Sequence, residues 1–533
     1  MWSSSSGSSR TSLALHHMFP ARESGDPLAR GSDGVFEPHL REGSMPHDAG
    51  ANQGKSDEVM VPMKSVKTRV TPVESMEGRT EANGSVAALT TASTQSEITV
   101  VRLQRLQQRA ATKTTEQWTN LLTIITEPLL TQAFLALRKN AAVGIDNVTW
   151  DQYAENLSAN ISALTRRVHD GTYDPLPVKR VFIAKADGTM RPLGLPALED
   201  KIVQQAVRWV VEPIWESEFC DESYGYRPKR SAHQALNSVF MAICYKKVSW
   251  ILDADIQSFF DTLDHEWLQR FIEYRIADKR LVKLLMKWLK AGVMDREQWH
   301  ASEAGTPQGG LIGPLLANLY LHYVLDLWIR QWRKRGVRGE VYYTRYCDDF
   351  VLCFQREKDA REFREAVAER LSKFKLTLHE KKTRVLEFGK FAAEDRAKRG
   401  EKKPETFTFL GFTHIVLNVG QRTRLLRRTS GKKLRASAAR VKERLQRMRH
   451  DPVKKQHQWL CQVLRGHDGY YGVPGNVRML TVYRRRLMNA WVRQLQRRSQ
   501  RARWDNEQLH RFEIRFALPP PRICHPWPQR QRL

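Results

Sequence analysis

Residues Tyr346 to Asp349, with the sequence YCDD, stand between two short apolar runs, and this pattern predicts the tip of a β-hairpin. Val341-Tyr342-Tyr343 precedes the tip, and Phe350-Val351-Leu352 follows it. Two adjacent carboxylates on a tight turn repel each other unless a cation neutralises them. Mg²⁺ suits this position, because it takes one or two carboxylates and completes its octahedron with water and substrate phosphates. The hairpin is therefore a candidate phosphoryl-transfer site, although an Asp pair alone is more often a solvated loop tip.

A second acidic motif, WILDADIQSFFDTLDH, runs from Trp250 to His265. Its apolar start predicts a short buried strand with Asp255 at its end. A strand with one Asp packed beside a hairpin with two would gather three carboxylates. That is the ligand set for two metal ions about 3.5–4 Å apart, which clamp the attacking and leaving oxygens of an in-line displacement. The other acidic residues of the motif are interpreted as capping or solvated, because an Asp one position off the inward face points away: Asp253, Asp261 and Asp264.

A glycine-rich segment, GTPQGG at residues 305–310, precedes an apolar run from Leu315 to Trp328. Its glycines allow the backbone to approach a ligand closely, and the apolar run predicts a buried helix. Taken alone, the segment is no more than a glycine-rich loop before a core helix.

The three motifs follow one another in the order Asp255, GTPQGG, YCDD, and the chain resembles the group II intron-encoded reverse transcriptases with maturase activity. The resemblance runs from about Val143 to Pro528 and consists of many ordered blocks. The further blocks are GIDNVTWDQY, RVFIAKADGTMRPLGLPALEDKIVQQAV, SYGYRPKRSAHQAL, LTLHEKKTRVLEF, FTFLGF, LRGHDGYYGVPGN, LQRRSQ and PRICHPWP.

This resemblance implies an α+β multidomain protein, in which a right-hand polymerase is followed by a helical maturase domain called domain X. We expect a disordered, low-complexity extension at 1–95, an N-terminal helical extension and fingers at 96–249, and the palm with its catalytic carboxylates at 250–415. The thumb and domain X are expected at 416–533. The implied function is that of an RNA-directed DNA polymerase and maturase, which promotes intron splicing and reverse-transcribes intron RNA during mobility. Implied partners are group II intron RNA, primer–template RNA/DNA, target DNA and dNTPs, with no membrane.

The resemblance also assigns roles to individual positions. Asp255, Asp348 and Asp349 match the catalytic carboxylates that hold two Mg²⁺ ions. Phe260 matches the steric gate that blocks a ribose 2′-hydroxyl, so that deoxynucleotides are preferred. Lys185 and Arg191 match residues that hold the incoming triphosphate. The loop at the nucleotide site is matched by Gln308, Gly309 and Gly310, and blocks near the primer end are matched at Lys382 and Gly411.

Two positions depart from the pattern of the family. Gly313 stands where a Ser is usual, and Cys347 stands where the residue before the Asp pair is usually Ala. Both replacements are small side chains, so we expect activity to survive.

The formal charge of +29 is concentrated at the C-terminal end of the chain, where residues 421–533 contain 29 Lys and Arg against 6 Asp and Glu. This density favours a polyanionic partner, because neutralised phosphates release their condensed counterions. A membrane surface is the competing polyanion, but interleaved aromatic residues suit unpaired RNA bases. Possible RNA-binding residues are Arg427, Arg428, Lys432, Lys433, Arg435, Arg484, Arg485, Arg497 and Arg498.

The six cysteines contain no C-x-x-C pair, which argues against a disulfide scaffold and fits a reducing cytosol. Many relatives end in a zinc-supported HNH endonuclease domain built from Cys pairs and His, so we expect that domain to be absent here. The expected localisation is a bacterial cytoplasmic, nucleoid-associated ribonucleoprotein. An organellar location is less favoured, because acidic residues interrupt the Ser-rich start, MWSSSSGSSR.

Apolar spacing predicts several helices. They are expected in a helical extension that begins near Ile98, within Leu268–Met294, Leu315–Trp332 and Ala360–Phe374, and along 434–448, where apolar residues fall three or four apart.

Three alternatives remain open. The first is a reverse transcriptase of retron or defence type without a splicing role, against which the domain X blocks argue. The second is an RNA-binding splicing factor with an inactive polymerase, against which the full set of three aspartates argues. The third is an RNA-templated RNA polymerase, which Phe260 disfavours.

Overall fold

The computed structural model describes the backbone of residues 86–113, 116–184, 190–295, 298–302, 304–306, 309–401, 404–419, 422–499 and 504–528. Side chains are described in these ranges from residue 99 onward, except at 184, 191, 418, 419 and 422. All of them belong to one compact unit, Gln53–Leu533. Most of the extension predicted at 1–95 therefore lies outside the described residues. Its last part, 86–95, is helical, since Ala, Leu and Gln favour a helix even without apolar periodicity.

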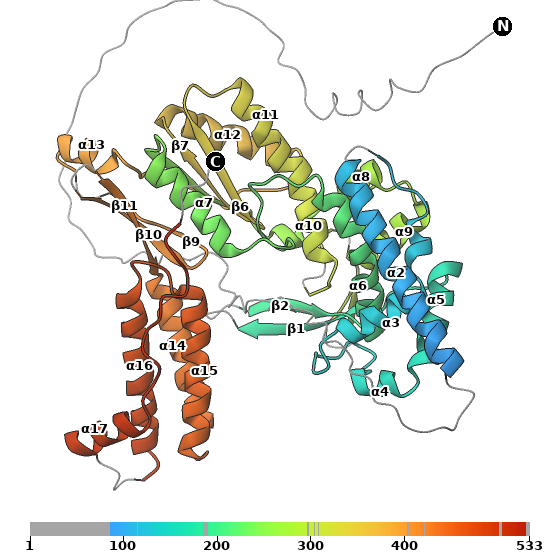
Figure 1. Cartoon of the computed structure of the whole chain (residues 1–533). Helices are drawn as coiled ribbons and strands as arrows, with labels where there is room; N and C mark the ends of the chain where they lie inside the picture. Colours follow the sequence, from blue (N-terminus) through green and yellow to red (C-terminus); the bar gives the residue numbers. More distant parts are fainter. Residues whose placement is uncertain are drawn as a thin grey trace, which may run out of the picture. The chain divides into compact units, whose positions relative to one another are not determined.

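Helices dominate the first described segment (Figure 1). Helices α2 and α3 pack on α6, whose apolar residues at three-four spacing form a buried face. A capping box between Thr149 and Gln152 begins α4. The elements are α2 (Val86–Thr112), the 3₁₀ turn η1 (Leu121–Ile124), α3 (Glu127–Ala136), α4 (Trp150–Glu155), α5 (Leu157–Asp170) and α6 (Leu198–Glu216).

A four-stranded sheet in the order β2-β1-β4-β5 stands next to these helices (Figure 1). Its strands are β1 (Val178–Ala184), β2 (Met190–Leu195), β4 (Val293–Asp295) and β5 (Gln298–His300). Strand β1 pairs antiparallel with β2 and parallel with β4. Residues 293–300, which the sequence places in the palm, therefore complete a sheet that starts in the preceding segment.

The central sheet has the order β6-β7-β3-β8, with every pair antiparallel. Alternate residues face opposite sides. Helix α7 packs on the side of Ile251 and Val351, whereas α11 and α12 pack on the side of Phe354, against Trp332 and Phe363 (Figure 1). The elements are β3 (Trp250–Asp255), β6 (Val341–Tyr346), β7 (Asp349–Phe354), β8 (Arg384–Glu387), α7 (Ala232–Tyr245), α11 (Leu327–Arg335) and α12 (Glu357–Ser372). Both the strand before Asp255 and the YCDD hairpin are thus confirmed.

The helical stretch predicted within 268–294 is two helices, because the Asp278 carboxylate accepts hydrogen bonds from the first amides of the second helix. Asp264 caps the first helix, as predicted. Asp253, in contrast, is 2% exposed and faces Arg384, so its interpretation as solvated or capping is wrong. The elements are the 3₁₀ turn η2 (Phe259–Asp261), α8 (His265–Arg275), α9 (Lys279–Lys290), α10 (Gly313–Leu321) and the π-helical turn η3 (His322–Asp326), which leads into α11.

A third sheet, in the order β11-β10-β9, connects the central region to four C-terminal helices (Figure 1). The predicted apolar face of α14 is confirmed, with Leu434, Val441 and Leu445 buried against α15 and α16. The predicted palm boundary near 415 falls inside β10, so the hairpin β10–β11 crosses it. The elements are α13 (Ala392–Lys398), β9 (Phe407–Phe409), β10 (Phe412–Val419), β11 (Arg422–Thr429), α14 (Gly431–Arg447), α15 (Val453–Tyr471), α16 (Val477–Gln496) and α17 (Asn506–Arg515).

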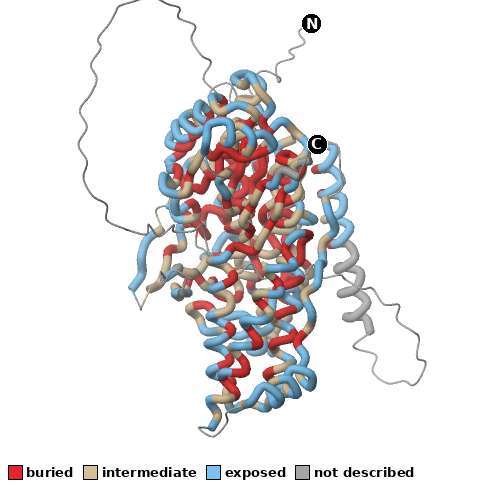
Figure 2. Tube along the Cα trace, turned by 90° about the vertical axis from the view of Figure 1, so that its left-hand side faces the viewer, coloured by how far each residue is buried: buried red, intermediate tan, exposed pale blue. Residues whose placement is uncertain are grey.

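Buried residues lie on the strands and on the helix faces that point into the molecule, and exposed residues lie on the outward helix faces (Figure 2). Among the described helices, none combines the length and the hydropathy that a membrane crossing requires.

Candidate active site

The YCDD residues form the tight turn between β6 and β7. Tyr346 and Asp349 are cross-strand partners, so Cys347 and Asp348 alone make the turn. Cys347 has a φ of 59°, a left-handed conformation that is uncommon for residues other than glycine. Strained backbone of this kind persists where the surrounding structure holds it and often marks a functional site. We refer to residues 346–349 as the catalytic turn.

Asp255 lies directly opposite Asp349 in the register between β3 and β7. Residues directly opposite each other in an antiparallel pair have side chains on the same face of the sheet. Asp348 precedes Asp349 in the turn and is half-buried, like Asp349, whereas Asp255 is 5% exposed. The fold therefore brings the backbone positions of all three predicted carboxylates to one end of the central sheet.

The Asp255 carboxylate forms an ion pair with a lysine side chain of the same chain. The Lys382 ammonium lies 2.9 Å from its Oδ2 atom, and both side chains are largely buried. Within the described part of the chain, no three His, Cys, Asp or Glu side chains gather closely enough to hold a metal ion. Carboxylate oxygens are nevertheless the donors that Mg²⁺ prefers, and the ion pair with Lys382 demonstrates that a positive charge is accommodated at Asp255.

The GTPQGG loop lies between the turn η2 and strand β2. The amide of Thr306 donates to the carbonyl of Phe260 (2.7 Å), and the amide of Gly305 donates to Leu263 (2.7 Å). Gly309 has a φ of 125°, and a Cβ atom there would collide with the carbonyl oxygen of Gly194 in β2. This close approach explains the glycine, and Gly310 continues the loop toward α10.

Phe260 is half-buried beside this loop, and its neighbour Phe259 is a core residue at 2% exposure. The two rings pack edge to face with their centroids 5.4 Å apart. Phe260 is thus less tightly packed than Phe259 and lies five residues after Asp255, and its role as a steric gate stays a prediction. Three other predicted nucleotide-site residues lie outside the described residues, wholly or in their side chains: Lys185, Gln308 and Arg191.

Gly411 joins β9 to β10 with a φ of 79°, and a Cβ atom there would lie 2.9 Å from the Tyr471 hydroxyl. The glycine therefore lets the third sheet meet the end of α15. The block LRGHDGYYGVPGN has the same structural role, because Asn476 hydrogen-bonds Thr429 at 2.8 and 2.9 Å.

The predicted RNA-binding residues of the C-terminal segment differ in burial and in their contacts. Arg427 is 2% exposed and donates to Asn237 at 2.8 Å, so this prediction is corrected: the side chain joins β11 to α7. Arg484 and Arg498 donate to main-chain carbonyls and have structural contacts. The exposed members are Arg435, Arg485 and Arg497, while Arg428, Lys432 and Lys433 are half-buried.

Sequence reasoning overlooked a buried polar group directly beneath the catalytic turn. Arg345 is fully buried and pairs with Asp326, and Asn318 lies beside them. The signal was present, since Asn318 and Asp326 interrupt the apolar run 315–328 and Arg345 directly precedes YCDD. Charged and amide side chains within an apolar helix and strand are rarely buried unless they bind one another.

A sheet with carboxylates from a strand end and a hairpin turn, bordered by a glycine loop, defines a nucleotidyl-transfer class of protein. The family model for the reverse transcriptase (RNA-dependent DNA polymerase) matches residues 183–414. The protein YkfC of Escherichia coli is 38% identical over 287 residues, which cover 48% of this chain and 75% of that protein. The group II intron-encoded protein LtrA of Lactococcus lactis is 37% identical over 238 residues, covering 44% of this chain and 39% of LtrA.

Nuclear intron maturase 4 of Arabidopsis thaliana is similar as well, with 27% identity over 197 residues that cover 36% of this chain and 23% of that protein. The chain belongs to the reverse transcriptase family, and it is similar to proteins of that family named as group II intron-encoded and as intron maturases. Enzymes of this family use divalent metal ions and act on nucleic acid. The alignments span well under half of the length of LtrA and of the plant maturase.

Proposed function

We propose that the chain is an RNA-directed DNA polymerase that also binds a group II intron RNA and promotes its splicing. The observation that carries the polymerase function is the register of Asp255 opposite Asp349, with Asp348 in the same turn. The intron-related function is supported by similarity to proteins named as intron-encoded and as maturases.

Asp255, Asp348 and Asp349 would hold two Mg²⁺ ions, which supply a polarised primer hydroxyl and charge neutralisation at the phosphates of the incoming dNTP. The protein itself supplies positioning, since phosphoryl transfer needs little covalent chemistry from side chains. Phe260 would contact the sugar of the dNTP, and the loop with Gly309 and Gly310 would support the base pair. Lys382 would neutralise Asp255 before a metal ion and substrate arrive.

In this proposal the helical segment and first sheet are the fingers, the central sheet is the palm, and α14 begins the thumb, with domain X beyond it. The exposed basic side chains of α14 and α16 would bind the phosphates of the primer–template and of the intron RNA. Specificity for the intron would come from the shape of irregular RNA, in which unstacked bases and 2′-hydroxyls are accessible.

Primer extension on an RNA template with Mg²⁺ and dNTPs tests the polymerase function. Wild type should extend the primer, and Asp348→Ala should reduce the rate by about 10²–10⁴-fold, because a bound metal contributes several kcal/mol of transition-state stabilisation. Asp170→Ala, at an exposed carboxylate at the end of α5, is the control and should retain full activity. Equal extension by wild type and Asp348→Ala would remove the catalytic assignment.

Splicing of a precursor RNA that contains the host intron tests the maturase function. Splicing at low Mg²⁺ should be accelerated by wild type and also by Asp348→Ala, since RNA binding does not use the catalytic carboxylate. A reverse transcriptase of retron or defence type would extend primers but leave splicing unchanged. That outcome would favour the alternative function.

A further inference from the structure

A fully buried arginine lies beneath the catalytic turn and contacts it directly. Nη1 of Arg345 donates to the carbonyl oxygen of Cys347 at 3.0 Å, which is the carbonyl between the two residues of the turn. The same Nη1 donates to Oδ1 of Asn318 in α10 at 3.0 Å. Nε and Nη2 bind the two oxygens of Asp326 at 2.8 and 2.6 Å. One guanidinium group therefore holds three elements of the fold at once.

The carboxylate of Asp326 comes from the π-helical turn η3. Asp326 has no exposed side-chain surface, and it also accepts a hydrogen bond from the Tyr343 hydroxyl at 2.7 Å. Burial lowers the pKa of Arg345, but the Asp326 charge outweighs burial, so the net shift of the pKa is upward. A buried pair of charges is weak evidence for stability, since well-packed apolar residues often serve as well. Because Arg345 of this pair also donates to the Cys347 carbonyl, the ion pair instead determines the position of that carbonyl.

The loop before α7 is attached to the same group from the other side. Nδ2 of Asn318 donates to the carbonyl of Gly225 at 2.7 Å, and a Cβ atom on Gly225 would lie 2.5 Å from the amide nitrogen of Cys347. The main-chain amide of Arg345 donates to the main-chain carbonyl of Glu222 at 2.8 Å, and the amide of Tyr224 donates to the main-chain carbonyl of Arg345 at 2.9 Å. Residues 222–225 therefore extend along the end of β6 up to the turn.

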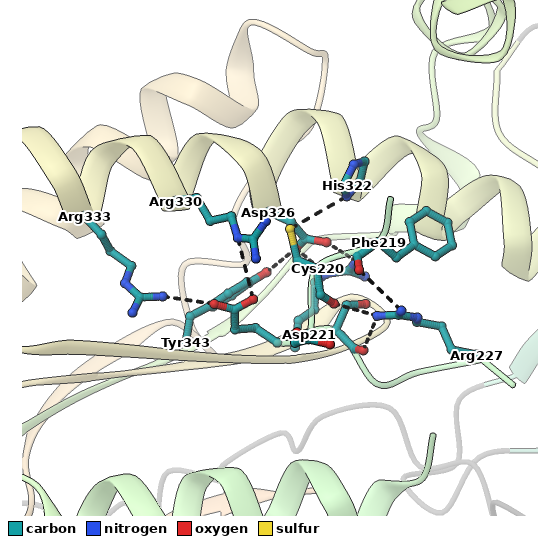
Figure 3. Close-up of polar contacts among 12 residues, drawn as sticks. Phe219, Cys220, Asp221, Arg227, His322, Asp326, Arg330, Arg333 and Tyr343 are labelled. Carbon is teal, nitrogen blue, oxygen red and sulfur yellow. Dashed lines mark hydrogen bonds and ion pairs between the residues drawn. The ribbon is translucent and has the colours of Figure 1, made fainter. Parts of the chain in front are cut away.

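Arg227 fixes this loop through main-chain carbonyls. Its Nη1 donates to Cys220 at 2.6 Å and to Ser223 at 2.8 Å, and its Nε binds Glu216 at the end of α6. Figure 3 shows Arg227 on one side of the loop, and Arg330 and Arg333 of α11 pointing toward it from the other side. Arg333 binds Glu222 at 3.1 Å. The loop is thus held rigidly between two helices.

On the basis of the proposed function, we infer that Arg345 is a positioning residue for nucleotidyl transfer: with Asp326 and Asn318, it fixes the Cys347 carbonyl and so directs Asp348 and Asp349 toward Asp255. The turn needs such support for two reasons. Cys347 has left-handed backbone, which is strained for a residue with a side chain. In addition, three carboxylates that share one end of the sheet repel one another and push the turn away from Asp255.

Arg345→Lys is the informative variant, because it keeps the positive charge and loses the fork. An ammonium group has three donors at one point and cannot bind two carboxylate oxygens, an amide oxygen and a carbonyl at their separate positions. Small displacements of catalytic groups reduce rate strongly, by about 10²-fold for 1 Å. We expect Arg345→Lys to lower kcat for dNTP incorporation by about 10²-fold, while KM for dNTP and the affinity for primer–template stay within about threefold.

Arg275→Lys is the matched control. Arg275, the last residue of α8, is also fully buried. It pairs with Glu218, and its guanidinium group donates to the main-chain carbonyls of Glu116 (2.9 Å) and Lys113 (3.2 Å). It should lose a similar amount of thermal stability and keep kcat within about threefold. An equal loss of kcat in both variants would overturn the inference, since it would reflect folding alone.

Asn318→Leu serves as the second variant, in case Arg345→Lys does not fold. It keeps the side-chain volume and the ion pair but removes the link to Gly225 and one acceptor of Arg345. We expect kcat to fall about tenfold, with dNTP KM unchanged, and an unchanged kcat would overturn the inference. These outcomes are distinct from failure of the proposed function, in which wild type itself extends no primer.

Discussion

The catalytic turn and the C-terminal helices are both rich in charged residues, but the charges near the turn are paired and largely buried, whereas those of the helices are mostly exposed. Close to the turn, Arg345 pairs with the buried Asp326, and Asp255 pairs with Lys382, whose side chain is largely buried. On α14 the Lys and Arg side chains project outward around one apolar face, and most of them are exposed. The function proposed for the turn depends on the exact positions of its atoms, whereas the nucleic-acid binding proposed for α14 depends on the number of positive charges on its surface.

This difference predicts how the two regions respond to substitution. A buried polar group that loses its partner keeps its desolvation penalty, and a displaced catalytic carboxylate loses rate steeply. An exposed cation interacts with phosphates through water and salt, so its loss is small and nearly additive with others. Single substitutions should therefore have large effects at the turn and small effects on α14.

Gly225→Ala should have the largest effect on the turn. The new Cβ atom would overlap the amide and the sulfur of Cys347, so the catalytic turn must move. We expect a fall in kcat of about 10²-fold, measured by primer extension with saturating dNTP.

Gly466→Ala in α15 is the corresponding change in the C-terminal region, because nothing lies within 4 Å of a Cβ atom at that position. It should leave polymerase activity unchanged and raise the free energy of unfolding by about 0.5–1 kcal/mol, since Ala favours a helix interior over Gly. If the two alanines affected kcat equally, the contrast between the regions would be wrong.

Phe260→Ala should have the next largest effect. If the ring excludes the ribose 2′-hydroxyl, its removal should reduce discrimination between dNTP and rNTP by about 10–10²-fold, as typical single-group selectivity suggests. The measurement is kcat/KM for a matched dNTP and rNTP pair. Phe259→Leu, in the adjacent core position, is the control and should change stability without changing the ratio.

The sequence was sufficient to predict the strand and the turn that contain the three aspartates, because each of these elements is local. A strand that ends in Asp255 and a hairpin tip at YCDD follow from short apolar runs in the sequence, and the structure contains both. The apolar face of α14 was predictable for the same reason, since its spacing repeats within one helix. Residue roles such as the steric gate came from the family resemblance and remain predictions.

The support of the site was not predictable, because it depends on long-range packing. Arg345 meets Asp326 across 19 residues and Asn318 across 27, and Asn318 meets Gly225 across 93. No local pattern distinguishes the buried Arg427 from the exposed Arg435, because both lie in runs of basic residues. The pairing of β4 and β5 with the earlier sheet is likewise a long-range contact that no local pattern indicates.

Lys382→Met should change how the site responds to metal ions. The variant leaves the largely buried Asp255 carboxylate without its cation, so Mg²⁺ gains a site with no competing charge. Thermal stability without Mg²⁺ should fall, and added Mg²⁺ should raise the melting temperature more than in wild type. Lys375→Met is the control, because Lys375 pairs with the helix-capping Asp264 and its variant should show no added response to Mg²⁺.

Neutralising exposed cations on α14 should have the smallest effect per residue. Arg435 and Arg440 are exposed on the polar side of the helix, and the double variant Arg435→Gln, Arg440→Gln would leave up to two phosphates of the RNA without a cation. The slope of log affinity for RNA against log salt should become shallower by about 0.7–0.9 for each phosphate that is no longer neutralised. Affinity at moderate salt should fall by only a few-fold. Arg361→Gln, at an exposed residue that pairs with Glu357 on α12, should leave the slope unchanged. An unaltered slope in the α14 variant would show that this helix does not bind the nucleic acid backbone, and the charge contrast between the two regions would then lack its functional meaning.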